Sequence, residues 1–432
     1  MLKNHRLQSI YKSSQALLPL VFFWFASIVG NICSWAHNLI ASHNLNLPQF
    51  ANFTIYQTFQ YLFSIFTVSY MIAVNRFGSA YFKSKSSKTI SPVYFSLFFS
   101  IVLGLVSSGL YLLTISWWTK YLHFSAITWF FPLSTLLFLI SVPLSWTRGI
   151  FNAQEQYVTS GVSHLLESFS KIILAGLATL IFYKFAFISL ALPFSMLIAF
   201  VIALFQLKKP LQILFAKPIK LSISKSFLHF YLQAIVLQIG ALTLINIDVL
   251  LVKHYFSPQQ AGVYALLSLV GKTILFGSQS FAYLLIPIVS SKIEKGEATQ
   301  KAFFLILLIT TGSAALASAL FYFLPNLVLR LLLGSHYQLV LPYLGAYQLA
   351  MIGLTIALTF SVYHLLKKRF LYTLLVVIAL VFETVLIILR HQTLTQVVGN
   401  VLLAAGTLCL FMIIMHMHKF ITMLKNGYGQ NN

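Results

Sequence analysis

Few charged residues interrupt the long apolar runs of this sequence, and the most isolated of them is a lysine. Lys272 lies about 14 residues into an apolar run of about 30 residues, with no carboxylate within four residues on either side. In a helix that rises ~1.5 Å per residue, it would lie ~21 Å from the end of that run. A charge near the centre of a bilayer is costly and is by default a candidate for function. Two interpretations stay open: the ammonium faces a water-filled cavity and meets a diphosphate, or it pairs with a distant carboxylate such as Glu383.

A second lysine has a carboxylate close by in the sequence. Lys171 lies at a similar depth in its apolar run, and Glu167 precedes it by four residues. Glutamate before lysine at this spacing is the favourable orientation for an ion pair within a helix. We therefore expect a Glu167–Lys171 pair, with the alternative that the pair faces a cavity and exchanges partners there.

Two further carboxylates lie in apolar runs. Asp248 is close to the end of its run, near Lys253 and His254, which predicts an ion pair at the membrane interface. Glu383 lies about 13 residues into its run, and no Lys or Arg lies within four residues of it. Such an isolated acid is a candidate proton or cation site, or the partner of Lys272. The sequence does not choose between these two roles.

A polar segment, RGIFNAQEQY, separates two apolar runs. It begins at Arg148 and contains Glu155 near its end. It is expected either at the cytoplasmic mouth of a cavity or as a solvated loop. The twelve histidines show no metal-ligand spacing, since His416 and His418 would diverge on a helix. The two cysteines are far apart, and no glycine-rich phosphate loop is present. We expect no catalytic residue, no metal and no cofactor.

The composition sets the class of protein that positions these charges. The 432 residues are 59% hydrophobic and only 8% charged, with a mean hydropathy of +0.88. Soluble domains are roughly one-quarter charged, so this is a multi-pass membrane protein. The 28 Lys and Arg residues outnumber six acids. They fall in short loops between apolar runs, which indicates membrane orientation and not nucleic-acid binding.

Twelve runs are long enough to span a bilayer, which predicts an all-α membrane protein. The start of the chain resembles a signal peptide, but its apolar run is too long and is expected to be retained. If the spans alternate in direction, 21 of the 28 basic residues lie on one side and five on the other. This split places both termini in the cytoplasm. The runs are 15–39, 50–74, 90–116, 125–146, 157–183, 185–207, 226–252, 258–288, 301–325, 337–363, 370–390 and 395–418.

The runs divide evenly around a basic segment. We expect an N-terminal six-helix bundle over 1–207, a basic cytoplasmic linker over 208–225 and a C-terminal six-helix bundle over 226–432. Similar short segments beginning at Pro48 and Pro258 open the second and eighth runs, 210 residues apart. Halves that both start on one side would be related by a pseudo-two-fold axis along the membrane normal, as in parallel-repeat transporters.

The stretch from Asp248 to Pro287 resembles the polysaccharide exporters of the multidrug/oligosaccharidyl-lipid/polysaccharide superfamily. It has an Asp-x-x-Leu helix end at Asp248, then Phe-Ser-Pro, then Ala-Gly-x-Tyr ending at Tyr264, followed by Lys272 and an Ile-Pro near the helix end. RGIFNAQEQY also looks like the family's loop between helices four and five. The family often has several basic residues in its cavity, whereas this chain has two at mid-depth.

The resemblance implies a flippase for polyprenyl-diphosphate-linked oligosaccharides, of the O-antigen or capsule type, in a bacterial inner membrane. Two bundles would alternate access around a cationic cavity, in contact with membrane lipid. Lys272, Lys171 and Arg148 are the candidate substrate-binding residues. A proton or sodium ion is a candidate coupling ion, and polysaccharide polymerase machinery is a candidate partner. The candidates for coupling or ion pairing are Glu383, Glu167 and Asp248.

Three other functions fit the sequence less well. A drug or cation antiporter of the same superfamily calls for acids in the cavity, yet the first four runs hold none. Lipid II flippases usually have more than twelve helices. An integral-membrane glycosyltransferase or polymerase would need acidic or large outer loops, and the outer loops here are short. We therefore expect a transporter and not an enzyme.

Overall fold

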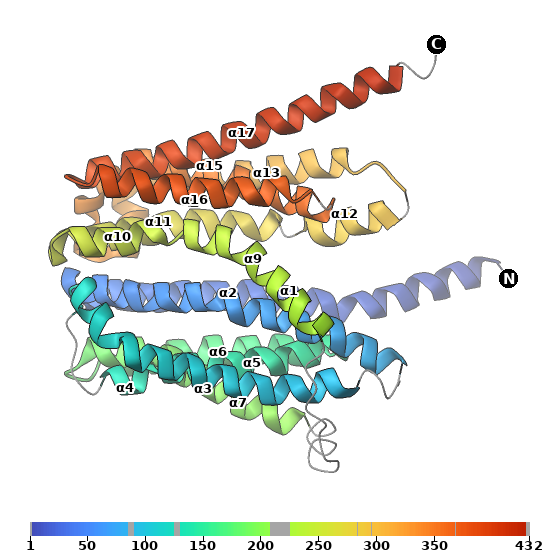
Figure 1. Cartoon of the computed structure of the whole chain (residues 1–432), viewed down its shortest axis with the longest axis horizontal. Coiled ribbons are helices and arrows are strands. Elements are labelled where there is room, and N and C mark those ends of the chain that lie inside the picture. Colours follow the sequence, from blue (N-terminus) through green and yellow to red (C-terminus); the bar gives the residue numbers. More distant parts are fainter. Residues whose placement is uncertain are drawn as a thin grey trace. The chain divides into compact units, whose positions relative to one another are not determined.

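The computed structural model describes residues 2–84, 90–124, 130–207, 225–282, 284–294, 296–367 and 369–428. Of the predicted basic linker, residues 208–224 lie outside this described part. The first half of the chain contains the helices α1 (Leu2–Asn44), α2 (Leu47–Ser84), α3 (Ile90–Tyr121), α4 (Phe130–Ser134), α5 (Leu136–Ala153), α6 (Tyr157–Ala178) and α7 (Lys184–Gln206) (Figure 1).

The second half is also helical throughout its described residues, with several short breaks. It contains α9 (Lys225–Leu244), α10 (Ile247–Tyr255), α11 (Pro258–Ala282), α12 (Leu285–Glu294), α13 (Gln300–Phe323), η2 (Pro325–Leu329), α14 (Arg330–Leu333), η3 (Gly334–Val340), α15 (Leu341–Leu366), α16 (Leu371–Leu389) and α17 (Leu394–Tyr428).

The predicted all-α fold class is confirmed. When α4 is taken with α5, α9 with α10, α11 with α12, and η2, α14 and η3 with α15, the described residues form twelve helical segments, one for each predicted run. Nine of the described segments are long and apolar enough to cross a membrane. α1, α2 and α6 are not in that set; α6, for example, carries four serines besides Glu167 and Lys171. The division of the fifth and sixth runs is also confirmed, because α6 ends at Ala178 and α7 begins at Lys184.

Some helices extend well beyond the predicted spans. α1 has 43 residues, which at ~1.5 Å per residue is ~64 Å. The hydrocarbon core of a bilayer is only ~30 Å thick. The apolar run therefore located the span, but the helix continues into the basic residues before it.

The chain divides into two compact units. Residues 1–45 and 59–238 form the first, and residues 46–58 and 239–432 form the second. In the first unit α1 packs along α6, and α6 along α7; in the second, α15 packs along α17 and α11 (Figure 1). The beginning of α2 groups with the second unit and the beginning of α9 with the first. The predicted boundaries at 207 and 226, and the symmetry axis, stay predictions.

The two proline-containing segments found in the sequence both begin helices with reciprocal side-chain caps. At α2, the Gln49 N–H donates to Asn46 Oδ1 at 2.9 Å, and the Asn46 N–H donates to Gln49 Oε1 at 3.3 Å. At α11, Ser257 and Gln260 make the corresponding pair of bonds. Such a capping box satisfies backbone N–H groups that lack helical partners. The same helix-start chemistry therefore occurs in both segments.

The two capped helix starts touch each other within the second unit. A Cβ added to Gly262 would lie 2.4 Å from the carbonyl oxygen of Leu47. Only a residue without a side chain permits this approach of two backbones. Gly262 thus fixes the beginning of α2 against the beginning of α11.

Candidate functional site

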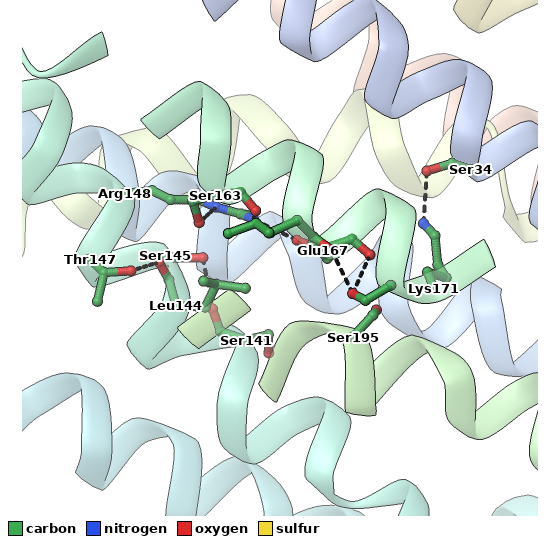
Figure 2. Close-up of polar contacts among 12 residues, drawn as sticks. Ser34, Ser141, Leu144, Ser145, Thr147, Arg148, Ser163, Glu167, Lys171 and Ser195 are labelled. Carbon is green, nitrogen blue, oxygen red and sulfur yellow. Dashed lines mark hydrogen bonds and ion pairs between the residues drawn. The ribbon is translucent and has the colours of Figure 1, made fainter. Parts of the chain in front are cut away.

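In the first unit, the buried charges lie between α5 and α6. Arg148 Nη2 and Glu167 Oε2 form an ion pair of 2.6 Å (Figure 2). The same guanidinium donates from Nη2 to the Ser163 carbonyl at 3.2 Å and from Nε to the Ser163 hydroxyl at 3.3 Å. Several donors aimed at one neighbouring turn are what a planar guanidinium provides. Arg148 therefore ties α5 to the middle of α6.

Lys171 lies one turn after Glu167 on α6, and its side chain points to a different helix. Its ammonium donates to the Ser34 hydroxyl of α1 at 2.8 Å (Figure 2). The lysine is 5% exposed, so the charge is buried in the unit. The partner that holds this cation is a neutral oxygen.

Two predictions about these residues are corrected by the geometry. The Glu167 carboxylate pairs with Arg148 across two helices, and not with Lys171 along one helix. The Arg148 guanidinium hydrogen-bonds Ser163, and Glu167 lies one helical turn after Ser163, so the same guanidinium reaches its carboxylate. The Lys171 side chain instead extends to Ser34 on α1. Arg148 also does not lie in a solvated loop, because α5 continues to Ala153 and the arginine is buried.

In the second unit, Lys272 is buried on α11 beside the break between α9 and α10. Its Nζ donates to Asn246 Oδ1 at 2.8 Å. The other end of the same amide donates to the Leu242 carbonyl at 2.8 Å. Asn246 is fully buried, so this contact is shielded from solvent. Asn246, like Ser34 beside Lys171, is a neutral hydrogen-bond acceptor for the ammonium.

Asp248 lies two residues after Asn246 and accepts hydrogen bonds from two tyrosines. The hydroxyls of Tyr264 and Tyr347 donate to Oδ2 at 2.8 and 2.9 Å. The backbone N–H of Val249 donates to Oδ1 at 2.8 Å. Asp248 is 2% exposed, and the predicted interfacial ion pair with Lys253 or His254 is wrong. Donors from α11 and α15 reach this carboxylate because both helices pack together beside it.

Glu383 is the second buried carboxylate of this unit. It is 1% exposed on α16, and neither carboxylate oxygen has a hydrogen-bond partner in the part of the chain that the structure describes. It lies close enough to Asp248 for the two carboxylates to interact electrostatically. Lys272 bonds Asn246 and is attracted by Asp248. The prediction that Glu383 is the partner of Lys272 is therefore not supported by a contact.

These arrangements define what each group can do. A buried ammonium held by a neutral oxygen keeps a positive charge that an anionic group can meet. Burying a carboxylate without hydrogen bonds costs free energy. Binding a proton or a cation lowers that cost because it removes or compensates the negative charge. The two units thus contain candidate anion-binding cations, and the second unit also contains a candidate cation-binding acid.

The sequence did not identify the neutral partners. Ser34, Ser163 and Asn246 carry no charge, and each lies in or beside an apolar run. Tyr264 ends the Ala-Gly-x-Tyr motif, and no sequence pattern selects Tyr347. The sequence feature that could have identified these partners is a polar side chain inside a spanning run, because such side chains usually face the bundle interior and not lipid. Many serines and threonines share that signal, so it does not select these residues.

No family model matches the chain, and no curated protein matches it. Solved structures do match it over nearly their whole length. One is an inward-facing multidrug resistance transporter of the MATE family, in the MOP superfamily, with a TM-score of 0.73 and 11% identity, covering 92% of this chain and 96% of that chain. Another is the lipid II flippase MurJ in an inward closed conformation, with a TM-score of 0.69 and 14% identity, covering 92% and 87%.

A third similar structure is a MOP superfamily transporter from Pyrococcus furiosus, with a TM-score of 0.55 and 13% identity, covering 94% of this chain and 95% of that chain. At these identities the likeness establishes the fold. The chain therefore has the fold of MOP superfamily transporters and flippases, as its sequence motifs predicted, and it is a multi-pass membrane protein.

Proposed function

We propose that the chain is a MOP superfamily flippase that moves polyprenyl-diphosphate-linked oligosaccharides from the cytoplasmic to the outer face of a bacterial inner membrane. The observation that carries the proposal is the pair of buried ammoniums, Lys171 and Lys272. Each is held by a neutral side-chain oxygen in its own unit. A diphosphate is an anionic group that such cations suit, and it has to pass the depth where they lie when it crosses the membrane.

The other charged residues have proposed roles as well. Arg148 binds substrate with the two lysines, while its ion pair with Glu167 sets its orientation. Glu383 and Asp248 couple transport to a proton or sodium gradient. Residues 1–207 and 226–432 act as the two halves of an alternating-access transporter, joined by the basic segment 208–225, with both termini in the cytoplasm. A polysaccharide polymerase uses the product on the outer face.

A second candidate function is export of organic cations, as the MATE-family names of similar structures suggest. One observation favours it: among the described residues, Glu383 is buried without a hydrogen-bond partner, near a second carboxylate. An organic cation would relieve the cost of burying these acids. The cations at mid-depth in both units favour the anionic substrate.

Proteoliposomes test both candidates. A fluorescent polyprenyl-diphosphate-linked oligosaccharide is incorporated on the inner leaflet, and its appearance on the outer leaflet is measured by membrane-impermeant quenching. The same vesicles are assayed for efflux of a fluorescent organic cation. Lipid-linked sugar movement without cation efflux supports the flippase. Cation efflux alone overturns it.

Variants of Lys272 link that activity to the site. Lys272→Ala is expected to abolish movement of the lipid-linked sugar, and Lys272→Arg to retain part of it, because charge is what a phosphate meets. Full activity of the alanine variant at normal membrane levels contradicts the assignment. In cells, loss of a flippase accumulates lipid-linked repeat units on the cytoplasmic face, whereas loss of an assembly enzyme changes the structure of the glycan.

A further inference from the structure

The break between α9 and α10 places a neutral amide against the Lys272 ammonium. α9 ends at Leu244 and α10 begins at Ile247, and Asn246 is the residue just before α10. Both ends of its side-chain amide are engaged. Oδ1 accepts from Lys272 Nζ at 2.8 Å, and Nδ2 donates to the Leu242 carbonyl at 2.8 Å. The donor end bonds a carbonyl that cannot donate, so the oxygen is the end that faces the ammonium.

The local helix start does not explain an asparagine here. Residues at this position normally use a side-chain oxygen to accept a backbone N–H from the first turn. Asn246 makes no such capping bond. Asparagine and aspartate are also about equally favourable at helix starts. The choice between these two nearly isosteric residues therefore depends on what the side chain meets, which is Lys272 at one end and the Leu242 carbonyl at the other.

An aspartate at this position would change the charge and not the shape. Its carboxylate would lie at hydrogen-bond distance from the ammonium and form a buried ion pair. It would also place an oxygen against the Leu242 carbonyl, which needs a donor. The nearest acid in sequence, Asp248, attracts the ammonium and accepts hydrogen bonds from Tyr264, Tyr347 and the Val249 N–H. Asn246 hydrogen-bonds the lysine without adding a second negative charge beside it.

We propose that Asn246 is a positioning residue that holds the Lys272 ammonium in place without adding a negative charge beside it. The affinity for a diphosphate then depends on residue 246 being a neutral hydrogen-bond acceptor. This inference rests on the proposed function, since it assigns Lys272 to the anionic group of the substrate. In the first unit, Ser34 holds Lys171 in the same way.

The test measures binding of farnesyl diphosphate to the full chain in lipid nanodiscs, together with the apparent melting temperature. Asn246→Asp is expected to weaken binding by the folded protein about tenfold or more. Its effect on the melting temperature is expected to be small, because the new ion pair stabilises the fold while the lost bond to the Leu242 carbonyl destabilises it. A role in folding alone would lower the melting temperature and leave the affinity of the folded fraction unchanged. Farnesyl monophosphate measures how much of the affinity the second phosphate supplies.

A double variant shows whether the effect passes through Lys272. In a Lys272→Met background, adding Asn246→Asp is expected to cause no further loss of binding. Wild-type binding by Asn246→Asp overturns the inference, as does an equal further loss in the Lys272→Met background. Unchanged binding by Lys272→Met alone instead contradicts the proposed substrate site, so the two failures are distinguishable.

Neutral variants keep the test decisive if Asn246→Asp does not fold. Asn246→Ser retains an uncharged acceptor and is expected to bind within about threefold of the wild type. Asn246→Leu removes the acceptor and is expected to bind more weakly than Asn246→Ser. Equal binding by these two variants overturns the positioning role. Ser34→Asp applies the same charge test beside Lys171, and a reduced affinity there supports the same arrangement in the first unit.

Discussion

Arg148 and Glu167, 19 residues apart in the sequence, form a 2.6 Å ion pair that joins α5 to α6. Their side chains are only 10% and 13% exposed. Removing one partner of a buried ion pair leaves a charge without compensation, which typically costs roughly 3–5 kcal/mol. The pair is therefore expected to hold the two helices together as well as to orient the guanidinium.

The first prediction concerns this pair. Arg148→Ala and Glu167→Ala should each lower the apparent melting temperature in nanodiscs by several degrees, and the double variant should lower it by less than the sum. The exposed Lys292–Glu297 pair, with side chains 35% and 50% exposed, is a matched control. Lys292→Ala should change stability by no more than ~1 kcal/mol. Additive effects of the two buried substitutions would show that the pair is not coupled.

The second prediction concerns the contact between two helix starts. Gly262→Ala would place a Cβ 2.4 Å from the Leu47 carbonyl oxygen, so the backbones of α2 and α11 would have to separate. Overpacking of this kind costs roughly 1–3 kcal/mol, and the melting temperature should fall. Gly277→Ala on the same helix meets nothing within 4 Å. It should be neutral or stabilising by up to ~1 kcal/mol, and a similar loss at both glycines would refute the explanation.

The third prediction separates stability from transport at Glu383. Both carboxylate oxygens lack hydrogen bonds in the described part of the chain, so this side chain is costly to bury. Glu383→Met has a similar volume and no carboxylate, and it should raise the melting temperature. It should also abolish the dependence of transport on a proton or sodium gradient. The half-exposed Glu297 is the control site, where Glu297→Gln should change stability by no more than ~1 kcal/mol and leave the gradient dependence unchanged.

A Glu383→Met variant that is less stable than the wild type would mean that the carboxylate contributes to packing or bonding. A variant that stays gradient-dependent would remove Glu383 from the coupling mechanism. Either result is read in the same nanodisc and proteoliposome preparations.

The fourth prediction concerns two histidines that meet in the core of the second unit. His364 Nε2 and His416 Nδ1 are 3.0 Å apart, so one imidazole donates to the other and joins α15 to α17. The His364 ring also stacks on Tyr372, with centroids 3.5 Å apart. His364→Phe alone leaves the buried His416 nitrogen without this partner, which costs roughly 1–3 kcal/mol. The double variant with His416→Phe should recover part of that loss, and a double variant less stable than the sum of the singles would contradict the pairing.

The sequence by itself determined the fold class of this protein. Apolar runs of bilayer length have few alternatives to helices, because backbone groups in hydrocarbon must be satisfied within the segment. The alternating placement of basic residues supported the count of twelve apolar runs, and each of these runs contains a helix in the described part of the chain. The helix ends were predicted less well, since α1 continues to Leu2 through polar residues that a hydropathy pattern excludes.

The sequence also determined which charges are buried at mid-depth, because Lys171, Lys272 and Glu383 lie far from the ends of their runs. Only the tertiary structure decided their partners. The nearest opposite charge in sequence was the wrong partner for Glu167, and Asp248 bonds tyrosines and not its basic neighbours. The physical reason is that a buried side chain bonds whatever a neighbouring helix presents at its depth. Ser34 and Lys171 are 137 residues apart, and no pattern along one helix records which helices pack together.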